Sequence, residues 1–243
     1  MDEAKILQLK DEIEDAQHIV FFGGAGVSTE SGVPDFRSKD GLYNQRDVRF
    51  DKYRPEYLLS HSCLIYEPKV YYEFHRQKMD TRTIEPNNAH KYLAAIEKLG
   101  KLDAVVTQNI DGLHQKAGSK NVLELHGSVL RNTCMKCGKF HTAEEVFGSE
   151  GIPRCECGGI IKPDVVLYEE GLDGHIMERA ARAIYDADML IVAGTSLTVY
   201  PAAGMIRYYR GKRLVLINRD TTPYDSEANL VIHESMGEVF SEL

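Results

Sequence analysis

The fold is decided by the stretch HIVFFGGAG, residues 18–26. Residues 18–22 form an apolar run, which is typical of a strand that is buried on both faces of a parallel sheet. Three glycines follow within four residues, and such a cluster indicates a tight turn. We therefore predict a buried parallel strand that is followed by a glycine-rich turn and by a helix that starts near Ser28.

Further apolar runs alternate with helical patterns along the chain. The runs cover residues 102–106, 122–125, 189–193 and 214–217. The helical patterns cover residues 4–16, 87–99 and 176–187. Strands that alternate with helices imply right-handed crossovers and a parallel sheet with helices on both faces. The predicted fold class is α/β, with a doubly wound, Rossmann-like parallel sheet.

Two stretches interrupt this alternation. Residues 41–79 are rich in tyrosine and charge, with helical spacing over residues 66–79, and residues 131–161 contain most of the cysteines. The second stretch has little apolar periodicity, so it cannot form a core unaided. We predict a smaller, discontinuous domain made of a helical module (41–79) and a zinc-binding module (131–161). Residues 1–40, 80–130 and 162–243 would form the larger, Rossmann-like domain.

Composition excludes several classes of protein. The 243 residues include 43% hydrophobic and 27% charged residues, which is typical of a globular chain. The net charge of −8 opposes non-specific binding to nucleic acid or to an anionic membrane, whereas it would attract a basic peptide. Because the sequence contains neither an apolar run long enough to span a membrane nor the pattern of a signal peptide, we expect a cytoplasmic protein without a nucleic-acid or membrane partner. We also expect a monomer.

Four of the five cysteines lie close together in the sequence. They are Cys134, Cys137, Cys155 and Cys157. In a reducing compartment such a cluster indicates a metal site in preference to disulfides, and four protein ligands around Zn²⁺ indicate a structural site. The second pair is separated by one residue, which leaves His141 open as a substitute ligand. The isolated Cys63 is predicted to be a packed residue and not a nucleophile.

Polar residues follow three of the predicted strands. Gly24 and Gly26 come after the first strand, Asn109 and Asp111 after the second, and His126 after the third. Ligands of open α/β sheets bind beyond the carboxyl ends of the strands, so these groups can converge on one cleft. The third glycine of the dinucleotide-binding pattern is replaced, so a plain turn explains the glycines as well as a dinucleotide site does. A histidine at the end of a strand is usually a structural residue.

Several separated motifs, taken together, resemble the sirtuin family of NAD-dependent protein-lysine deacylases. The motifs are GAGVS at 24–28, GVPDFR at 32–37, TQNID at 107–111, GLH at 112–114, LHG at 125–127, the cysteine quartet, GTS at 194–196 and IN at 217–218. The resemblance covers nearly the whole chain. It implies NAD+ as a co-substrate, which makes the Rossmann-like domain (1–40, 80–130 and 162–243) the NAD-binding domain. It also implies a structural Zn²⁺ ion held by the four cysteines.

The resemblance also implies roles for individual residues. His126 would be the general base that takes a proton from a ribose hydroxyl, Asn109 and Asp111 would bind the nicotinamide side, and Phe36 would shield the ribose from water. The NAD-binding residues implied are Gly24, Ala25, Gly26, Ser28, Thr29, Asp35, Phe36, Arg37, Gln108, Asn109, Ile110, Asp111, Gly194, Thr195, Ser196 and Asn218. Gly23 stands where many relatives have threonine, which predicts a slightly different phosphate contact.

Residues 163–170 resemble the family strand that pairs with the peptide substrate. Val166, Leu167 and Tyr168 would contact the substrate, and Val166 with Phe36 would line the acyl-lysine tunnel. The common family sequence Phe-Gly-Glu is Tyr-Glu-Glu at residues 168–170, and its extra carboxylate favours acetylated substrates with basic flanks. The tyrosine and arginine of succinyl-removing relatives align with His75 and Lys78, so neutral acyl groups are favoured.

The function predicted by this resemblance is that of an NAD-dependent protein-lysine deacetylase. It would transfer the acetyl group of acetyl-lysine to ADP-ribose and release nicotinamide. Two alternatives stay open at this stage, a protein mono-ADP-ribosyltransferase and an inactive NAD-sensing scaffold. A hydride-transferring dehydrogenase is disfavoured by the missing third glycine.

Overall fold

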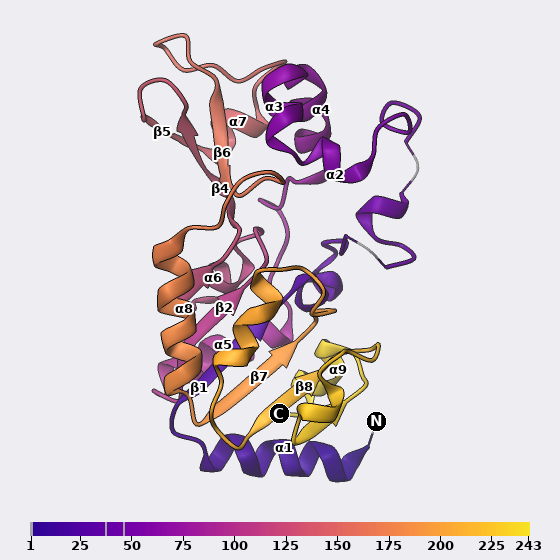
Figure 1. Cartoon of the computed structure of the whole chain (residues 1–243), viewed down its shortest axis with the longest axis vertical. Coiled ribbons are helices and arrows are strands. Elements are labelled where there is room, and N and C mark those ends of the chain that lie inside the picture. Colours follow the sequence, from indigo (N-terminus) through magenta and orange to yellow (C-terminus); the bar gives the residue numbers. More distant parts are fainter. Residues whose placement is uncertain (1, 37, 46) are drawn as a thin grey trace.

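A six-stranded parallel sheet forms the larger part of the protein (Figure 1). The computed structural model describes residues 2–36, 38–45 and 47–243. The strands are β1 (Ile19–Gly23), β2 (Leu102–Thr107), β3 (Val122–Glu124), β7 (Met189–Ala193), β8 (Leu214–Ile217) and β9 (Leu230–Ile232). Their order in the sheet is β3-β2-β1-β7-β8-β9, with β1 between β2 and β7. The predicted doubly wound parallel sheet is confirmed.

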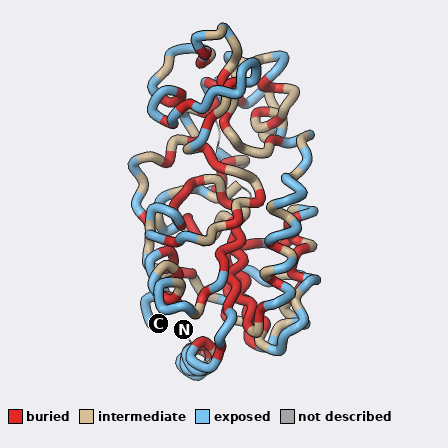
Figure 2. The backbone as a smooth tube through the Cα atoms, turned by 90° about the vertical axis from the view of Figure 1, so that its left-hand side faces the viewer, coloured by how far each residue is buried: buried red, intermediate tan, exposed pale blue. Residues whose placement is uncertain are grey.

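Both faces of the sheet are buried under helices. Ile19 and Phe21 of β1 pack on one face with helices α1 (Glu3–Asp15), α5 (Asn88–Lys98) and α9 (Met236–Ser241). Val20 and Phe22 pack on the opposite face with α8 (Gly174–Asp186) and the short helix η4 (Ala202–Tyr208). Figure 2 shows the result as buried backbone that runs through the middle of the larger part. The continuous apolar run in the sequence follows from this two-sided burial.

The predicted helices form, and their caps explain where they begin. The Asp2 side chain accepts hydrogen bonds from the first turn of α1, and Asn87 forms a capping box at the start of α5. Asp173 caps α8 in the same way as Asp2 caps α1. The described part of the chain contains no helix long and apolar enough to cross a membrane.

Two features of the larger part differ from the prediction. The helix expected near Ser28 is wrong, because the chain forms two short 3₁₀ turns, η1 (Ala25–Val27) and η2 (Thr29–Ser31). Gly32 then adopts a left-handed conformation with φ at 91° and ends the second turn. Strand β9 was not predicted, because its apolar run, residues 230–232, is shorter than the runs of four or five residues that indicated the other parallel strands.

A smaller part lies beside the carboxyl ends of the parallel strands, at the top of Figure 1. Its antiparallel sheet has the order β5-β4-β6. The elements of this part are η3 (Leu42–Asn44), α2 (Pro55–Leu58), α3 (His61–Tyr66), α4 (Pro68–Lys78), β4 (Gly127–Cys134), β5 (Phe140–Thr142), α7 (Ala143–Phe147) and β6 (Ile161–Val165). The antiparallel sheet includes residues 127–130 and 162–165 as well as the predicted zinc module, and the domain boundaries stay a prediction.

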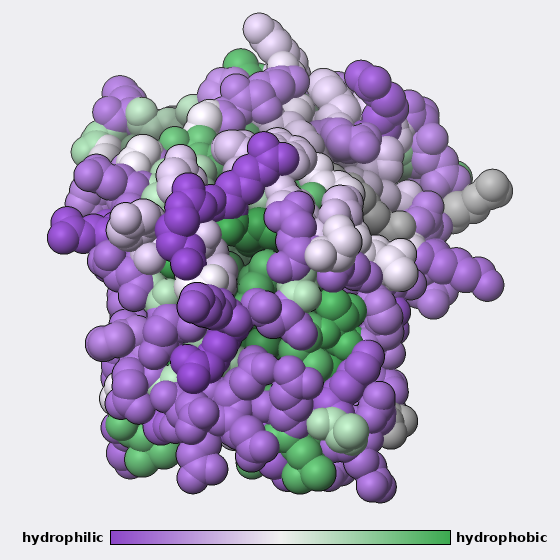
Figure 3. All heavy atoms as spheres, turned by 60° about the horizontal axis from the view of Figure 1, so that its bottom comes forward, coloured by the Kyte–Doolittle hydropathy of each residue, from purple (hydrophilic) through white to green (hydrophobic). Residues whose placement is uncertain are grey.

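Two short helices complete the chain, α6 (Leu113–Ala117) after β2 and η5 (Asp225–Glu227) before β9. On the face shown in Figure 3, hydrophilic residues predominate and hydrophobic residues appear in separate groups between them. This mixture agrees with the composition of a globular chain.

Candidate active site

A cavity of about 1320 Å³ lies at the carboxyl ends of the central parallel strands. The predicted residues that line it are Gly24, Ala25, Gly26, Thr29, Asp35, Phe36, Gln108, Asn109, Ile110, His126, Val166, Leu167, Tyr168, Gly194, Thr195, Ser196 and Asn218. Ser28 and Asp111 do not belong to this lining, and Arg37 lies outside the described residues. The fold therefore brings almost the whole predicted set to one place.

His126 stands between strand β3 and strand β4, and one hydrogen bond fixes its tautomer. Its Nδ1 lies 2.9 Å from the backbone carbonyl oxygen of Gln108. A carbonyl oxygen can only accept, so Nδ1 carries the proton and Nε2 of the neutral ring has a free lone pair. Burial lowers the pKa of His126, and the hydrogen bond to Gln108 opposes this shift. The imidazole is therefore a neutral base near pH 7.

Behind the cavity wall, Ser28 and Asp111 form a buried network with Asn109, which lines the cavity. The Ser28 hydroxyl donates to Asp111 Oδ2 at 2.7 Å and accepts from Asn109 Nδ2 at 3.1 Å. Asp111 Oδ1 also accepts from the Leu113 backbone N–H at 2.9 Å. Burial is the main cause that raises the pKa of Asp111. In this arrangement Ser28 and Asp111 hold Asn109, and their direct contact with NAD+ stays a prediction.

The glycines of the first turn are required by packing inside the protein. A Cβ atom on Gly24 would lie 2.7 Å from Thr195 Cβ, and one on Gly26 would lie 2.7 Å from Gly194 Cα. The Gly26 backbone N–H donates to the Gly194 carbonyl at 2.8 Å. The sequence indicates a tight turn at these glycines, which either a plain turn or a dinucleotide site explains. The structure adds close contact between the turn after β1 and the turn after β7.

The segment predicted to bind the substrate, residues 163–170, is a regular strand only in its first part. Strand β6 ends at Val165, and the pairing of residues 163–170 with a peptide stays a prediction. The Val166 backbone N–H still donates to the His126 carbonyl at 2.9 Å, next to the Gly127–Val165 pair of the antiparallel sheet. The Tyr168 N–H instead donates to the Leu59 carbonyl at 3.0 Å, so the chain has turned from β4 toward the start of helix α3. Residues 166–168 then line the cavity.

The two glutamates after Tyr168 are bound to neighbouring groups. Glu169 has a positive φ of 75°, at the position where the family commonly has glycine. Its carboxylate accepts from the backbone N–H and the hydroxyl of Ser62, at 2.9 and 2.7 Å. Glu170 forms a hydrogen bond with His61 Nδ1 at 2.9 Å and an ion pair with Lys162 at 3.1 Å. Glu169 is the more exposed of the two.

The four clustered cysteines meet as a metal site requires. Their sulfur atoms all lie within 4.8 Å of one another, with 3.5 Å between Cys134 and Cys157 and 3.7 Å between Cys137 and Cys155. A zinc ion with bonds of about 2.3 Å needs tetrahedron edges of about 3.8 Å, so the sulfurs fit Zn²⁺. His141 is outside this cluster and pairs with Glu145 at 3.4 Å. The fourth ligand is therefore a cysteine, as in the Cys₄ prediction.

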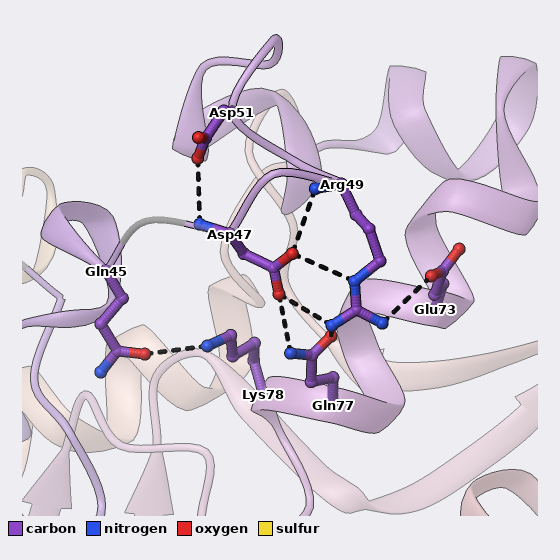
Figure 4. A network of polar contacts seen from close by, with 7 residues as sticks. All are labelled: Gln45, Asp47, Arg49, Asp51, Glu73, Gln77 and Lys78. Carbon is purple, nitrogen blue, oxygen red and sulfur yellow. Dashed lines mark hydrogen bonds and ion pairs between the residues drawn. The ribbon is translucent and has the colours of Figure 1, made fainter.

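Three residues weighed in the sequence lie apart from the cavity. Cys63 is fully buried, and burial raises the pKa of its thiol to about 12, so it is a packed residue. His75 is stacked on Phe147 with ring centroids 4.8 Å apart. The Lys78 ammonium group donates to Gln45 Oε1 at 2.9 Å (Figure 4). Neither His75 nor Lys78 belongs to the cavity lining.

The cavity also has lining residues that the sequence argument missed. They include Glu30, Tyr43, Leu59, Asn87 and the segment 234–238. The last segment follows β9, so the rule that ligands bind at the ends of parallel strands would have found it if this strand had been predicted. Tyr43 and Leu59 carry no comparable signal, because they come from the irregular part of the chain.

The fold and the cavity define an α/β protein with a nucleotide-sized site at the carboxyl ends of its parallel strands and a separate Cys₄ module. Residues 24–201 match the Sir2 family. The chain therefore belongs to the Sir2 family.

Curated relatives match over almost their whole length. A protein of Clostridium acetobutylicum named NAD-dependent protein deacetylase is 58% identical over 97% of this chain and 96% of its own. A protein of Clostridium perfringens with the same name is 55% identical over 98% of both chains.

Solved Sir2 structures have the same fold. One, with a deacetylated p53 peptide and 3'-O-acetyl-ADP-ribose, has a TM-score of 0.86 and 34% identity, and the match covers 98% of this chain and 96% of that one. Another, with a p53 peptide and NAD+, has a TM-score of 0.82 and 35% identity over 96% of this chain and 95% of that one.

Proposed function

We propose that the protein is an NAD-dependent protein-lysine deacetylase, which transfers the acetyl group of acetyl-lysine to ADP-ribose and releases nicotinamide. The observation that carries this proposal is the position of His126 in the cavity, with Nδ1 bound to a carbonyl and Nε2 left as the acceptor. The names of the curated relatives support the same activity.

The cavity fits a dinucleotide together with a substrate side chain. Its volume of about 1320 Å³ exceeds the roughly 300–1,000 Å³ of sites for single small molecules. NAD+ would supply a ribose carbon whose nicotinamide substituent leaves as a neutral molecule. The glycine turn and residues 194–196 would hold the nucleotide from the sheet side.

His126 would act as the general base toward a ribose hydroxyl. Because burial lowers its pKa, the neutral form predominates near pH 7, and Nε2 can accept the proton. The Gln108 carbonyl holds the opposite ring nitrogen, so the ring keeps its orientation when the proton arrives. The proton-bearing ring is then able to return the proton to a leaving group.

Asn109 would orient the nicotinamide carboxamide. Its side chain is held by Ser28, which is itself held by Asp111, so the amide cannot rotate without breaking a buried hydrogen bond. Phe36 and Ile110 contribute apolar surface to the same cavity. Such surface excludes water that would otherwise compete with the acetyl group for the ribose carbon.

The substrates we propose are peptides with a neutral acyl group on lysine and basic flanking residues. The side chains of His75 and Lys78 lie outside the cavity lining, so neither offers its charge to an acidic acyl group there. The exposed Glu169 and the net charge of −8 favour a basic peptide.

A panel of lysine peptides tests this proposal. The purified protein is incubated with NAD+ and peptides that carry acetyl, propionyl or succinyl groups, each with basic or acidic flanks, and the products are identified by mass spectrometry. We expect free lysine peptide and O-acetyl-ADP-ribose in equal amounts from the acetyl peptide, with nicotinamide in small excess from hydrolysis of NAD+, and less turnover of the succinyl and acidic peptides.

Other products would reject the proposal. ADP-ribosylated protein without deacetylated peptide would identify a mono-ADP-ribosyltransferase. NAD+ binding with no release of nicotinamide in the presence of any peptide would identify an inactive NAD-sensing scaffold.

A further inference from the structure

Two tyrosine hydroxyls meet across the wall of the cavity. Tyr43 Oη and Tyr168 Oη lie 2.7 Å apart, within hydrogen-bond distance. Tyr43 belongs to η3 in the segment that follows the glycine turn, whereas Tyr168 belongs to the substrate-binding segment after β6. Both side chains line the cavity. The hydrogen bond therefore joins the segment that would cover NAD+ to the segment that would hold the peptide.

Tyr43 is in turn coupled to Phe36. The two rings make an edge contact, with centroids 5.6 Å apart and planes at 63°. The Tyr43 backbone N–H also donates to the Phe36 carbonyl at 2.9 Å. The position of the Phe36 ring in the cavity thus depends on the position of Tyr43.

Tyr168 is firmly attached to the smaller part of the protein. Its backbone N–H donates to the Leu59 carbonyl, and its carbonyl accepts from the His61 N–H, each at 3.0 Å. The next residue, Glu169, is bound by Ser62. These partners lie just before helix α3 or in its first turn, so they fix the position of Tyr168. Tyr168 can therefore hold Tyr43 in place through the hydrogen bond between their hydroxyls.

The segment after Tyr43 is anchored on helix α4 by the network in Figure 4. Arg49 donates to Gln77 Oε1 at 2.6 Å, Gln77 donates to Asp47 at 2.8 Å, and Lys78 donates to Gln45 at 2.9 Å. The hydrogen bond between Tyr43 and Tyr168 attaches the same segment on its cavity side, next to Phe36.

We propose that Tyr168 is a positioning residue that, through its hydroxyl and Tyr43, holds Phe36 in the cavity and so keeps water from the ribose. This inference rests on the proposed function, because it concerns how the released nicotinamide is divided between deacetylation and hydrolysis of NAD+. Where the resembling family has phenylalanine, this chain has a hydroxyl that can make the bond.

Removal of either hydroxyl tests the inference. In Tyr168→Phe and Tyr43→Phe, the amount of NAD+ hydrolysed per lysine deacetylated, measured as nicotinamide in excess of deacetylated peptide, should rise about fivefold, as expected from the loss of one ordinary hydrogen bond. In the double variant, the ratio of NAD+ hydrolysis to deacetylation should equal that of either single variant, because all three variants lack the same hydrogen bond. Tyr185→Phe is the matched control, since Tyr185 is exposed on helix α8 and should leave the ratio unchanged.

A second measurement needs no turnover. In the protein without nucleotide or peptide, hydrogen exchange of the Leu42 and Tyr43 amides should become about fivefold faster in Tyr168→Phe, because both amides are hydrogen-bonded within this segment. The control variant should exchange like the wild type.

The inference would be overturned if Tyr168→Phe left either the ratio of NAD+ hydrolysis to deacetylation or the hydrogen exchange of the Leu42 and Tyr43 amides unchanged. It would also be overturned if the effects of the two single variants on this ratio multiplied in the double variant. If the wild type deacetylates the peptide and the ratio does not move, only this inference fails. If the wild type does not deacetylate at all, the proposed function fails and this inference fails with it.

Discussion

The parallel sheet and the cysteine module are stabilised in different ways. Every residue of β1 and β7 is buried, and apolar side chains from both faces of the sheet form two large clusters. The fully buried members of the cluster around the cysteines are Cys134, Val146, Cys155 and Ile161. So small a cluster supplies little hydrophobic stabilisation, and the metal must supply the rest.

The two parts of the protein also place different groups around the cavity. His126, Asn109 and the glycine turn are placed by the parallel sheet and by hydrogen bonds at its edge. Tyr168 and Tyr43 are placed by the smaller part, which lies on the other side of the cavity. Damage to the smaller part should therefore remove substrate binding while the larger part stays folded.

Loss of zinc should have the largest effect. In Cys137→Ser, or after chelation of the metal, we expect loss of the bound zinc and a fall in deacetylation of more than about hundredfold, because the antiparallel sheet loses its central support. Zinc content, deacetylation and far-ultraviolet circular dichroism are measured together. Helical signal from the larger part should persist.

Cys63→Ala is the matched control for this prediction. It removes a buried sulfur from α3, outside the cluster, so zinc content should not change. A zinc-free Cys137→Ser protein with full activity would show that the two parts do not differ in the way described here.

Gly194→Ala should have the next largest effect, and it acts on the parallel sheet. Gly194 has φ at 59°, and a Cβ atom there would lie 2.5 Å from the Val27 backbone nitrogen. We expect the free energy of unfolding to fall by about 3 kcal/mol because backbone must move to admit the methyl group. Denaturant unfolding measures the change, and Gly171→Ala, where a Cβ would meet open space, is the control. Equal stability of the two variants would contradict the tight packing of the two turns.

Acid should destabilise the smaller part through His75. Burial is the main cause that lowers the pKa of His75 to about 3. The unfolded chain takes up a proton below about pH 6.5, whereas the folded chain stays neutral there. Proton uptake by the unfolded chain therefore lowers the free energy of unfolding progressively as the pH falls from about 6.5 toward 3, and has no effect on it above that range.

The variant His75→Phe checks this acid dependence. Phenylalanine can keep the stacked contact with Phe147 but cannot take up a proton. Between pH 7 and pH 5 the free energy of unfolding should fall by about 2 kcal/mol less than in the wild type. Denaturant unfolding at both pH values gives the two differences, and identical pH dependence would reject this role of His75.

The sequence predicts the parallel sheet well because its strands are buried on both faces. The runs at 189–193 and 214–217 coincide with β7 and β8. The helix expected after the glycine turn does not form, since this turn packs against Gly194, which lies far away in the sequence. No local pattern contains that contact.

The sequence predicts most residues of the candidate site, but it does not predict which of them line the cavity and which lie behind its wall. Motifs brought Ser28 and Asp111 to the correct end of the sheet, yet both lie behind the cavity wall because they bond to each other and to Asn109. Tyr43 could not have been found, because its contact with Tyr168 depends on how two irregular segments meet. Hydrogen bonds between distant residues set these details.

The central claim is that His126 is the base of an NAD-dependent deacetylation. The most direct measurement compares wild type with His126→Ala, using NAD+ and an acetyl-lysine peptide, and follows deacetylated peptide and bound NAD+ separately. We expect kcat to fall by about 10²–10⁴-fold, the contribution of a positioned general base, with NAD+ binding retained. Deacetylation at the wild-type rate by His126→Ala would contradict the account.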